Sequence, residues 1–555
     1  MRRVWIAFAV IVLLSVPALG IGWLHDDFIQ REMLTGSSAN LPRGAGELYC
    51  FAGGPDALAG SRWEAWWRSP QLTTCFFRPL SSLTLALDHS LGQPLLAHLH
   101  GLLWLLAACA GVAALAWILF GPSVAALAGL IYGVSSYTSS PVAWVAARHA
   151  AVSAALVAWG LCAYVRSRRQ SRSARLGLAV LTLALIGGEG ALGGLGFAVA
   201  YELLAARDTR RVRALHIAAA AALGAAYVLW YARSGYGTAG AGAYLDPLHH
   251  TGEFLAALPG RLLCLIGEAV LGAPSTLWSF SSRQLLLCGA GALGLLLALA
   301  ALRGSPRAAD PEQLRILHFL GVGALLCAIP AAAAILGGRV LLVPGIGLSI
   351  VFAAALTPRP ASSAAIALAV GVLLLGPLAR VAQIFAMRRI ATAEQQLSRS
   401  ALDGCEGAAH YLLLGTDEFS VAMYAPYLLA PRLGQKSWQQ LTLASADIEV
   451  SRPDARTLRL HASSGHLLSG LPYTMNRPQR SALTSGMQLP IAAGTIYIEA
   501  AEPAAISALR IELPVAAEDR RFCWLRYDGQ QLIPVALPPV GGALRIPHVR
   551  GPMAF

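Results

Sequence analysis

Long apolar stretches recur between residues 5 and 380 of this chain, and most contain about twenty residues, the length at which a helix can cross a bilayer. A soluble domain must cover its surface with polar side chains, and usually about a quarter of its residues are charged. Here 56% of the 555 residues are hydrophobic and only 13% are charged. The sequence therefore predicts an α-helical polytopic membrane protein.

The first apolar stretch follows Arg2 and Arg3 and is long enough to cross the bilayer. It is longer than the apolar part of a typical signal peptide, and no small-residue cleavage pattern precedes His25. We therefore expect an uncleaved span, with its N-terminus in the cytoplasm, rather than a removable signal. Asp26 and Asp27 would then lie at the outer surface of the membrane, where the chain leaves the bilayer.

Two clusters of arginine follow later apolar stretches, and both fall on the cytoplasmic side when spans are counted from the N-terminus. The positive-inside rule requires this placement. The clusters are Arg166, Arg168, Arg169, Arg172 and Arg175, and then Arg207, Arg210, Arg211 and Arg213. The net charge of +13 is thus attributed to membrane orientation, and no nucleic-acid partner is expected.

Counting the apolar stretches gives about 11 spans, with the C-terminus outside. Residues 176–205 are too many for one crossing and contain a glycine-rich break at 187–190, so two short helices are predicted there. Whether residues 254–273 cross is left open, because this apolar stretch contains Pro259, Arg261 and Glu268.

The composition changes near residue 391, which predicts two domains. Residues 1–390 would form the multi-span domain, and residues 391–555 a soluble, mainly β domain on the periplasmic side. Residues 447–463 and 522–537 alternate apolar and polar side chains about Pro453-Asp454 and Asp528-Gly529, the pattern of β-hairpins.

The first external loop is predicted to span residues 25–78. Its segment 62–72 places three tryptophans among charged residues, which is typical of a helix lying in the membrane interface. The alternative is that these are ordinary loop aromatics.

The nine cysteines divide between apolar and polar regions. Five lie in apolar stretches, where cysteine behaves as a small hydrophobic residue. Cys50 and Cys75 fall in the first loop, and Cys405 and Cys523 in the C-terminal region. Because both regions are expected in an oxidising compartment, two disulfides are predicted. No cysteine or histidine spacing indicates a metal site.

Five stretches, in order, resemble motifs of the GT-C superfamily of membrane glycosyltransferases. They are HDDF (25–28), FFRPLSSLTLALDHSLGQPLLAHLH (76–100), PVAWVAARHAAVSAAL (141–156), GGEGALGGLGFAVAYELL (187–204) and GGRVLLVPGIGLSIVFA (337–353). The resemblance implies a GT-C-like fold in a bacterial inner membrane. It also implies inverting transfer of a sugar from a polyprenyl-phosphate donor to a periplasmic acceptor, which would be a protein, a lipid or a glycan.

The same resemblance suggests where the chemistry takes place. Sugar transfer needs a carboxylate that accepts the proton of the attacking hydroxyl, and Asp26 or Asp27 stands at the family's acidic motif. The departing lipid phosphate needs a cation, for which arginine is well suited. The candidates for the donor side are Arg78, Arg339, Glu189 and Arg148.

Two alternatives stay open at this level. The acidic pair could hold a divalent cation, although no cofactor is firmly predicted. Several polar residues of the family are replaced here, for example by Gly188 and Gly338. These losses would also suit a catalytically inactive scaffold, or a transporter, built on the same framework.

Overall fold

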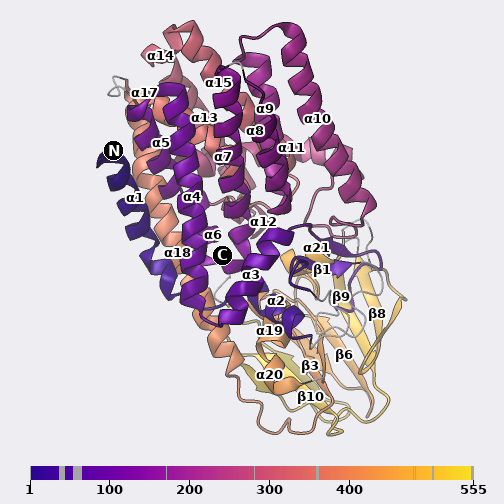
Figure 1. Cartoon of the computed structure of the whole chain (residues 1–555). Helices are drawn as coiled ribbons and strands as arrows, with labels where there is room; N and C mark the ends of the chain where they lie inside the picture. Colours follow the sequence, from indigo (N-terminus) through magenta and orange to yellow (C-terminus); the bar gives the residue numbers. More distant parts are fainter. Residues whose placement is uncertain are drawn as a thin grey trace.

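The computed structural model describes residues 2–36, 44–53, 65–170, 172–280, 282–357, 362–434, 436–478, 481, 483–502 and 505–551. A bundle of long helices occupies one half of the molecule, and a domain rich in strands occupies the other (Figure 1). The fold class predicted from the sequence, a helical membrane protein with a mainly β C-terminal region, is confirmed.

Long apolar stretches form the helices of the bundle. A helix satisfies its backbone hydrogen bonds internally, which a segment in a bilayer requires. The bundle helices are α1 (Arg2–Ser15), α4 (Pro94–Phe120), α5 (Pro122–Val134), α7 (His149–Arg169), α8 (Arg175–Leu183), α9 (Leu192–Leu204), α10 (Arg210–Arg233), α11 (Thr251–Leu271), α13 (Gln284–Arg303), α15 (Pro311–Ala331), α16 (Leu342–Ala355), α17 (Ser363–Val370) and α18 (Gly376–Ser398). Short helical segments connect them: η1 (Val16–Gly20), η2 (Ser136–Thr138), α6 (Ser139–Ala143), η3 (Val145–Arg148), η4 (Ala184–Ile186), η5 (Glu189–Ala191), α12 (Leu277–Phe280), α14 (Pro306–Ala309), η6 (Gly338–Leu341) and η7 (Gly371–Leu375).

Within the described residues, nine helices are long and apolar enough to cross a membrane, and two further apolar helices are shorter. About 11 spans were expected. The stretch that the sequence left open is one continuous helix, α11, and it belongs to the nine in spite of Pro259. The predicted break at residues 187–190 is present, since α8 and α9 are separate helices that meet there.

The first external loop folds at the end of the bundle that faces the C-terminal domain (Figure 1). It contains α2 (Asp26–Thr35) and the paired strands β1 (Cys50–Gly53) and β2 (Thr73–Cys75), and α3 (Pro79–Leu91) follows it directly. The disulfide Cys50–Cys75 joins the two strands, as predicted.

The tryptophan-rich segment does not form the expected interfacial helix where it is described, from residue 65 onward. Trp66 and Trp67 lie in a turn and are buried among apolar side chains of the C-terminal domain. Trp63 lies outside the described residues. The helix with an apolar outer face in this region is α3. It exposes Leu83, Leu87 and Leu91 at four-residue spacing, a pattern typical of contact with lipid.

The C-terminal domain contains two sheets. Four strands pair in the order β11-β10-β3-β4, and six in the order β12-β5-β6-β9-β8-β7. The strands are β3 (His410–Leu413), β4 (Ser437–Gln440), β5 (Ile448–Ser451), β6 (Thr457–Ala462), β7 (Gln488–Ile491), β8 (Gly494–Glu502), β9 (Ala505–Glu512), β10 (Phe522–Tyr527), β11 (Leu532–Pro534) and β12 (Ala543–Ile546), and the helices are α19 (Phe419–Leu428), α20 (Ala430–Leu433) and α21 (Gly470–Asn476). Both predicted hairpins, β5–β6 and β10–β11, and the disulfide Cys405–Cys523 are confirmed.

Strand β3 shows how the domain is attached to the loop. Successive side chains of a strand point to opposite faces. Leu412 packs in the core shared with the six-stranded sheet, whereas Tyr411 and Leu413 pack in a second core with α19 and the first external loop. The four-stranded sheet is therefore covered on both faces, and one of its covers is the loop that carries Asp26.

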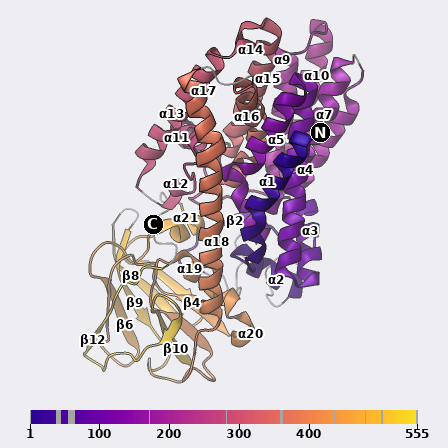
Figure 2. The same cartoon turned by 90° about the vertical axis from the view of Figure 1, so that its left-hand side faces the viewer.

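Helical structure is continuous from Ser363 to Ser398, over 36 residues, and connects the bundle to the C-terminal domain (Figure 2). Arg380 is fully buried in this stretch, where its guanidinium donates to Thr138 Oγ1 at 2.9 Å and to Ser15 Oγ at 2.7 Å. The stretch thus fixes the C-terminal domain to the helices of the N-terminal half. The predicted division at residue 390 falls inside α18.

Candidate active site

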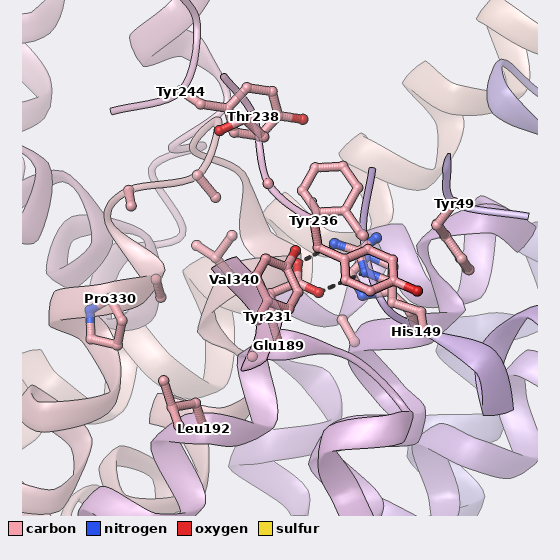
Figure 3. Close-up of a pocket in the computed structure, with 18 of the residues that line it drawn as sticks. Tyr49, His149, Glu189, Leu192, Tyr231, Tyr236, Thr238, Tyr244, Pro330 and Val340 are labelled. Carbon is pink, nitrogen blue, oxygen red and sulfur yellow. Dashed lines mark hydrogen bonds and ion pairs between the residues drawn. The ribbon is translucent and has the colours of Figure 1, made fainter. Parts of the chain in front are cut away.

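A cavity of about 520 Å³ lies where the helix ends of the bundle meet the first external loop. Four of the predicted site residues line it: Asp26, Arg78, Arg339 and, from the break between α8 and α9, Glu189. The rest of the lining is mostly small or apolar and includes eight aromatic side chains, Tyr49, Phe51, Phe76, Trp144, Tyr227, Tyr231, Tyr236 and Tyr244. In Figure 3, Tyr231 and Tyr236 lie beside Glu189.

Asp26 is the first residue of α2 and lines the cavity. Its Oδ1 accepts a hydrogen bond of 2.8 Å from the hydroxyl of Tyr424, which belongs to α19 of the C-terminal domain. Burial raises the pKa of Asp26 above that of a free aspartate, while Tyr424, His25 and the two cavity arginines act in the opposite direction. The pKa of the Asp26 carboxyl therefore depends on the balance between burial and these neighbours.

Asp27 points elsewhere, because adjacent residues of a helix do not share a face. Its two oxygens accept the backbone N–H groups of Leu24 at 2.9 Å and Ala146 at 2.8 Å. The side chain is buried and is not part of the cavity lining. Burial raises the pKa of Asp27 to about 8. The structure thus separates two acids that the sequence could not: Asp26 lies at the cavity, and Asp27 joins α2 to η3.

Arg78 and Glu189 form a bidentate pair across the cavity wall. Arg78 Nε donates to Glu189 Oε2 at 2.8 Å, and Nη2 donates to Oε1. The guanidinium also lies over the rings of Tyr49 and Phe76, 4.8 and 4.4 Å from their centroids. Arg78 directly precedes Pro79, at the N-terminal end of α3. The charge of Arg78 is therefore largely balanced within the protein.

Arg339 differs from Arg78 in having no carboxylate partner among the described residues. It follows Gly337 and Gly338 in η6, and its guanidinium lies 5.6 Å from the ring centroid of Trp144. Because Trp144 and Arg339 both line the cavity, the structure holds a cation there with its hydrogen-bond donors available.

Arg148 lies outside the cavity lining, although its neighbours in sequence, Ala147 and His149, belong to it. Its fully buried guanidinium pairs with Asp88 and donates to the carbonyl oxygen of Ala97 at 2.7 Å. These contacts join η3 to α3 and α4. The donor-binding role expected for Arg148 therefore has no support in its position.

Several residues of the site could not be found from local sequence. Tyr424 and Glu394 contact the segment around Asp26 from the last third of the chain, and no motif marks either of them. Tyr244, Asp246 and His249 also line the cavity, and Asp246 and His249 form a pair at 2.6 Å. A polar loop after a span was the only signal for these three.

The acidic pair does not present two carboxylates to one point, since both oxygens of Asp27 are engaged by backbone amides. Across the described ranges, no group of three or more histidine, cysteine, aspartate or glutamate side chains is arranged to hold a metal ion.

The fold and the site together define a polytopic membrane protein with an acidic and basic cavity at the junction of bundle, loop and C-terminal domain. Among solved structures, the chain is similar to ArnT from Cupriavidus metallidurans bound to undecaprenyl phosphate, with 14% identity, 77% of this chain and 84% of that chain covered, and a TM-score of 0.43.

It is also similar to the oligosaccharyltransferase of Archaeoglobus fulgidus tethered to an acceptor peptide, with 12% identity and a TM-score of 0.42. The same enzyme, AglB, in complex with an inhibitory peptide and dolichol-phosphate gives 11% identity and a TM-score of 0.41. In both cases 78% of this chain matches 64% of the archaeal chain, so it spans less than two thirds of that enzyme. These structures are GT-C membrane glycosyltransferases, and we take no residue role from them. No protein-family profile and no characterised protein sequence matches the chain.

Proposed function

We propose that this chain is a membrane glycosyltransferase that moves a sugar from a polyprenyl-phosphate donor to an acceptor on the outer side of a bacterial inner membrane. The single observation that carries the proposal is that Asp26 and Arg339 line the same cavity, and that neither has an ion-pair partner at contact distance among the described residues. The sequence resemblance to GT-C enzymes supports it.

In this proposal Asp26 is the general base. Its ionised carboxylate takes the proton from the acceptor hydroxyl as the hydroxyl oxygen attacks the anomeric carbon, and the bond from that carbon to the phosphate oxygen breaks. The bonding pair leaves with the lipid phosphate, and attack from the opposite side inverts the anomeric centre. A raised pKa makes Asp26 a stronger base than a free aspartate.

Arg339 is the proposed partner of the lipid phosphate. A guanidinium stays charged, forms two parallel hydrogen bonds to phosphate and is available here because no described carboxylate engages it. Arg78 is better described as part of the cavity wall, since Glu189 occupies two of its donors. The aromatic lining offers flat apolar faces against which a sugar ring can pack.

The proposal is tested by extracting lipid from the purified protein and detecting bound polyprenyl phosphate by mass spectrometry. We expect the lipid in the wild type, and we expect Arg339→Gln to bind polyprenyl phosphate about 10- to 100-fold more weakly, the loss that follows from removing a charged hydrogen bond. Arg388→Gln is the matched control, because Arg388 lies exposed on α18. Equal lipid in Arg339→Gln and Arg388→Gln would contradict the phosphate assignment.

The alternative of an inactive scaffold rests on the Arg78–Glu189 and Arg148–Asp88 pairs, in which predicted site residues neutralise one another. A scaffold of this kind would need neither a cavity nor an unpaired cation. Absence of glycosyl transfer by the folded wild-type chain, with bound polyprenyl phosphate present, would favour it over the enzyme.

A further inference from the structure

The C-terminal domain reaches the cavity through one hydrogen bond, from the Tyr424 hydroxyl to Asp26. The two residues are 398 positions apart, and the bond length is 2.8 Å. Tyr424 is itself buried and lies outside the cavity lining, so it acts on the site only through Asp26. A hydroxyl that donates to a carboxylate stabilises the ionised form of that carboxylate.

A second contact fixes the residue just before Asp26. Glu394 of α18 accepts the backbone N–H of His25 at 3.1 Å through Oε2, and its Oε1 lies 2.7 Å from His25 Nδ1. The His25 ring stacks on Tyr424, with 4.9 Å between centroids, and Trp144 and Phe419 approach it edge-on. All three side chains, His25, Glu394 and Tyr424, are buried.

The contacts of His25 hold its backbone in an unfavourable conformation. Its φ of 54° makes it the one residue other than glycine with a positive φ in the described part of the chain. Such a conformation is costly for a side-chain-bearing residue and persists only where the surroundings impose it. Here it starts α2 so that Asp26 faces the cavity while Asp27 turns to the backbone of Leu24 and Ala146.

We infer that Tyr424 and Glu394 are positioning residues for Asp26, so that the C-terminal domain completes the active site instead of only recognising the acceptor. The inference rests on the proposed function and deepens it. Tyr424 holds the carboxylate by its hydroxyl. Glu394 holds His25 in the strained conformation and favours the protonated form of its imidazole beside that carboxylate.

The charged and titratable groups around Asp26 come from every neighbouring element. They are Tyr424 from α19, Arg339 from η6, Arg78 from the start of α3, and His25 and Asp27 from the segment of Asp26 itself, with Glu394 acting through His25. Glu394 opposes the effect of burial on His25, and the pKa of His25 is raised. Removing the Tyr424 hydroxyl leaves the other groups in place, so the change isolates its contribution.

The experiment follows the protonation of Asp26 directly. Infrared titration of the purified full-length chain records the band of protonated carboxyl groups, and the difference from Asp26→Asn assigns the part due to Asp26. The same pair of measurements in a Tyr424→Phe background gives the midpoint without the hydroxyl. We expect that midpoint to rise by about one to two pH units, the loss expected for a hydrogen bond to a charged group. The acid limb of the pH–rate profile should move upward by the same amount.

Tyr527→Phe is the control, because this buried tyrosine of the same domain donates to the carbonyl oxygen of Gly529 at 2.7 Å. It should leave the Asp26 midpoint unchanged. Its effect on thermal unfolding should be similar to that of Tyr424→Phe. If Tyr424→Phe does not fold, Glu394→Gln gives the second measurement. That variant removes the anion beside His25, lowers the pKa of the imidazole and should also raise the Asp26 midpoint.

An unmoved midpoint in a folded Tyr424→Phe protein, with the band assigned to Asp26, would overturn the inference whatever the enzyme does. Failure of the proposed function is a different result. In that case the midpoint would still shift in Tyr424→Phe, but the folded wild-type chain would show no glycosyl transfer.

Discussion

At the scale of single residues, the structure gives two adjacent acids different surroundings. Asp26 faces a cavity with two arginines and a tyrosine hydroxyl, whereas Asp27 is sealed against backbone amides. The residues share a chemical type and a position at the start of α2. Only the direction of each side chain separates an acid that lines the cavity from an acid held by backbone amides.

This separation gives the first prediction. Asp26→Asn removes the proposed base and should lower glycosyl transfer about 10²- to 10⁴-fold, the usual contribution of general base catalysis. In cells that carry the variant in place of the wild type, the sugar-charged polyprenyl phosphate should accumulate, which lipid extraction and mass spectrometry would reveal. Asp27→Asn should leave the chemical step intact and act mainly on stability. Full activity in both variants would reject the assignment of the base.

Asp27 also gives a pH prediction. Its pKa is about 8 in the folded protein, above that of an aspartate in an unfolded chain. The folded state therefore binds the proton more tightly, and its contribution to stability is full below about pH 4 and is lost as the pH rises toward 8, at up to about 1.4 kcal/mol per pH unit. Thermal unfolding of the wild type should fall over this window, and Asp27→Asn should show a smaller fall. An identical pH dependence in both proteins would show that Asp27 is not the group responsible.

At the scale of elements, buried ion pairs join helices that enclose the cavity. Arg148 of η3 is fully buried against Asp88 of α3. Replacing one member leaves an uncompensated charge in the interior, so Asp88→Asn should cost about 3–5 kcal/mol of unfolding free energy. Chemical or thermal denaturation of the purified protein measures this.

The control for Asp88→Asn is Asp519→Asn, which removes one member of the surface ion pair with Arg521. It should leave the unfolding transition in place, because exposed ion pairs contribute little. If Asp88→Asn were as stable as the wild type, Arg148 would be free to serve another purpose, including the donor-binding role first expected of it.

Most helices and strands could be predicted from the sequence, because the patterns that mark them involve only neighbouring residues. A run of apolar residues predicts a span, and Asp528-Gly529 predicts the turn between β10 and β11, because each depends only on neighbouring residues. The segment around Trp66 was misjudged as an interfacial helix. Its apolar side chains pack against strands of the C-terminal domain, a partner that local sequence does not reveal.

The site was readable only in part for the same reason. Asp26, Arg78, Glu189 and Arg339 were predicted and line one cavity. The choice between Asp26 and Asp27, the pairing of Arg78 with Glu189 and the contact from Tyr424 depend on contacts between distant segments. Hydrogen bonds of this range leave no periodic pattern in the sequence.

At the scale of the whole molecule, the first loop and the C-terminal domain lie at one end of the bundle, and α14 lies at the other (Figure 1). We predict that the shared end is periplasmic. A cysteine introduced at Val540, which is exposed, should react with a membrane-impermeant maleimide in intact cells. A cysteine at Arg172, in the first arginine cluster, should react only after the membrane is opened. Labelling at position 172 in intact cells would show that the orientation is opposite to the predicted one, and it would contradict the enzymatic interpretation.

The hydrogen bond between residues 26 and 424 also has a consequence for biosynthesis. The ribosome makes the acid near the beginning of translation and its tyrosine partner near the end. A nascent or truncated polypeptide that lacks the last third of the sequence would carry the acid without its clamp. In the proposed glycosyltransferase, the carboxyl of an unfinished chain would therefore titrate at a higher pH, and it would reach its final proton affinity only once the last domain had folded against it.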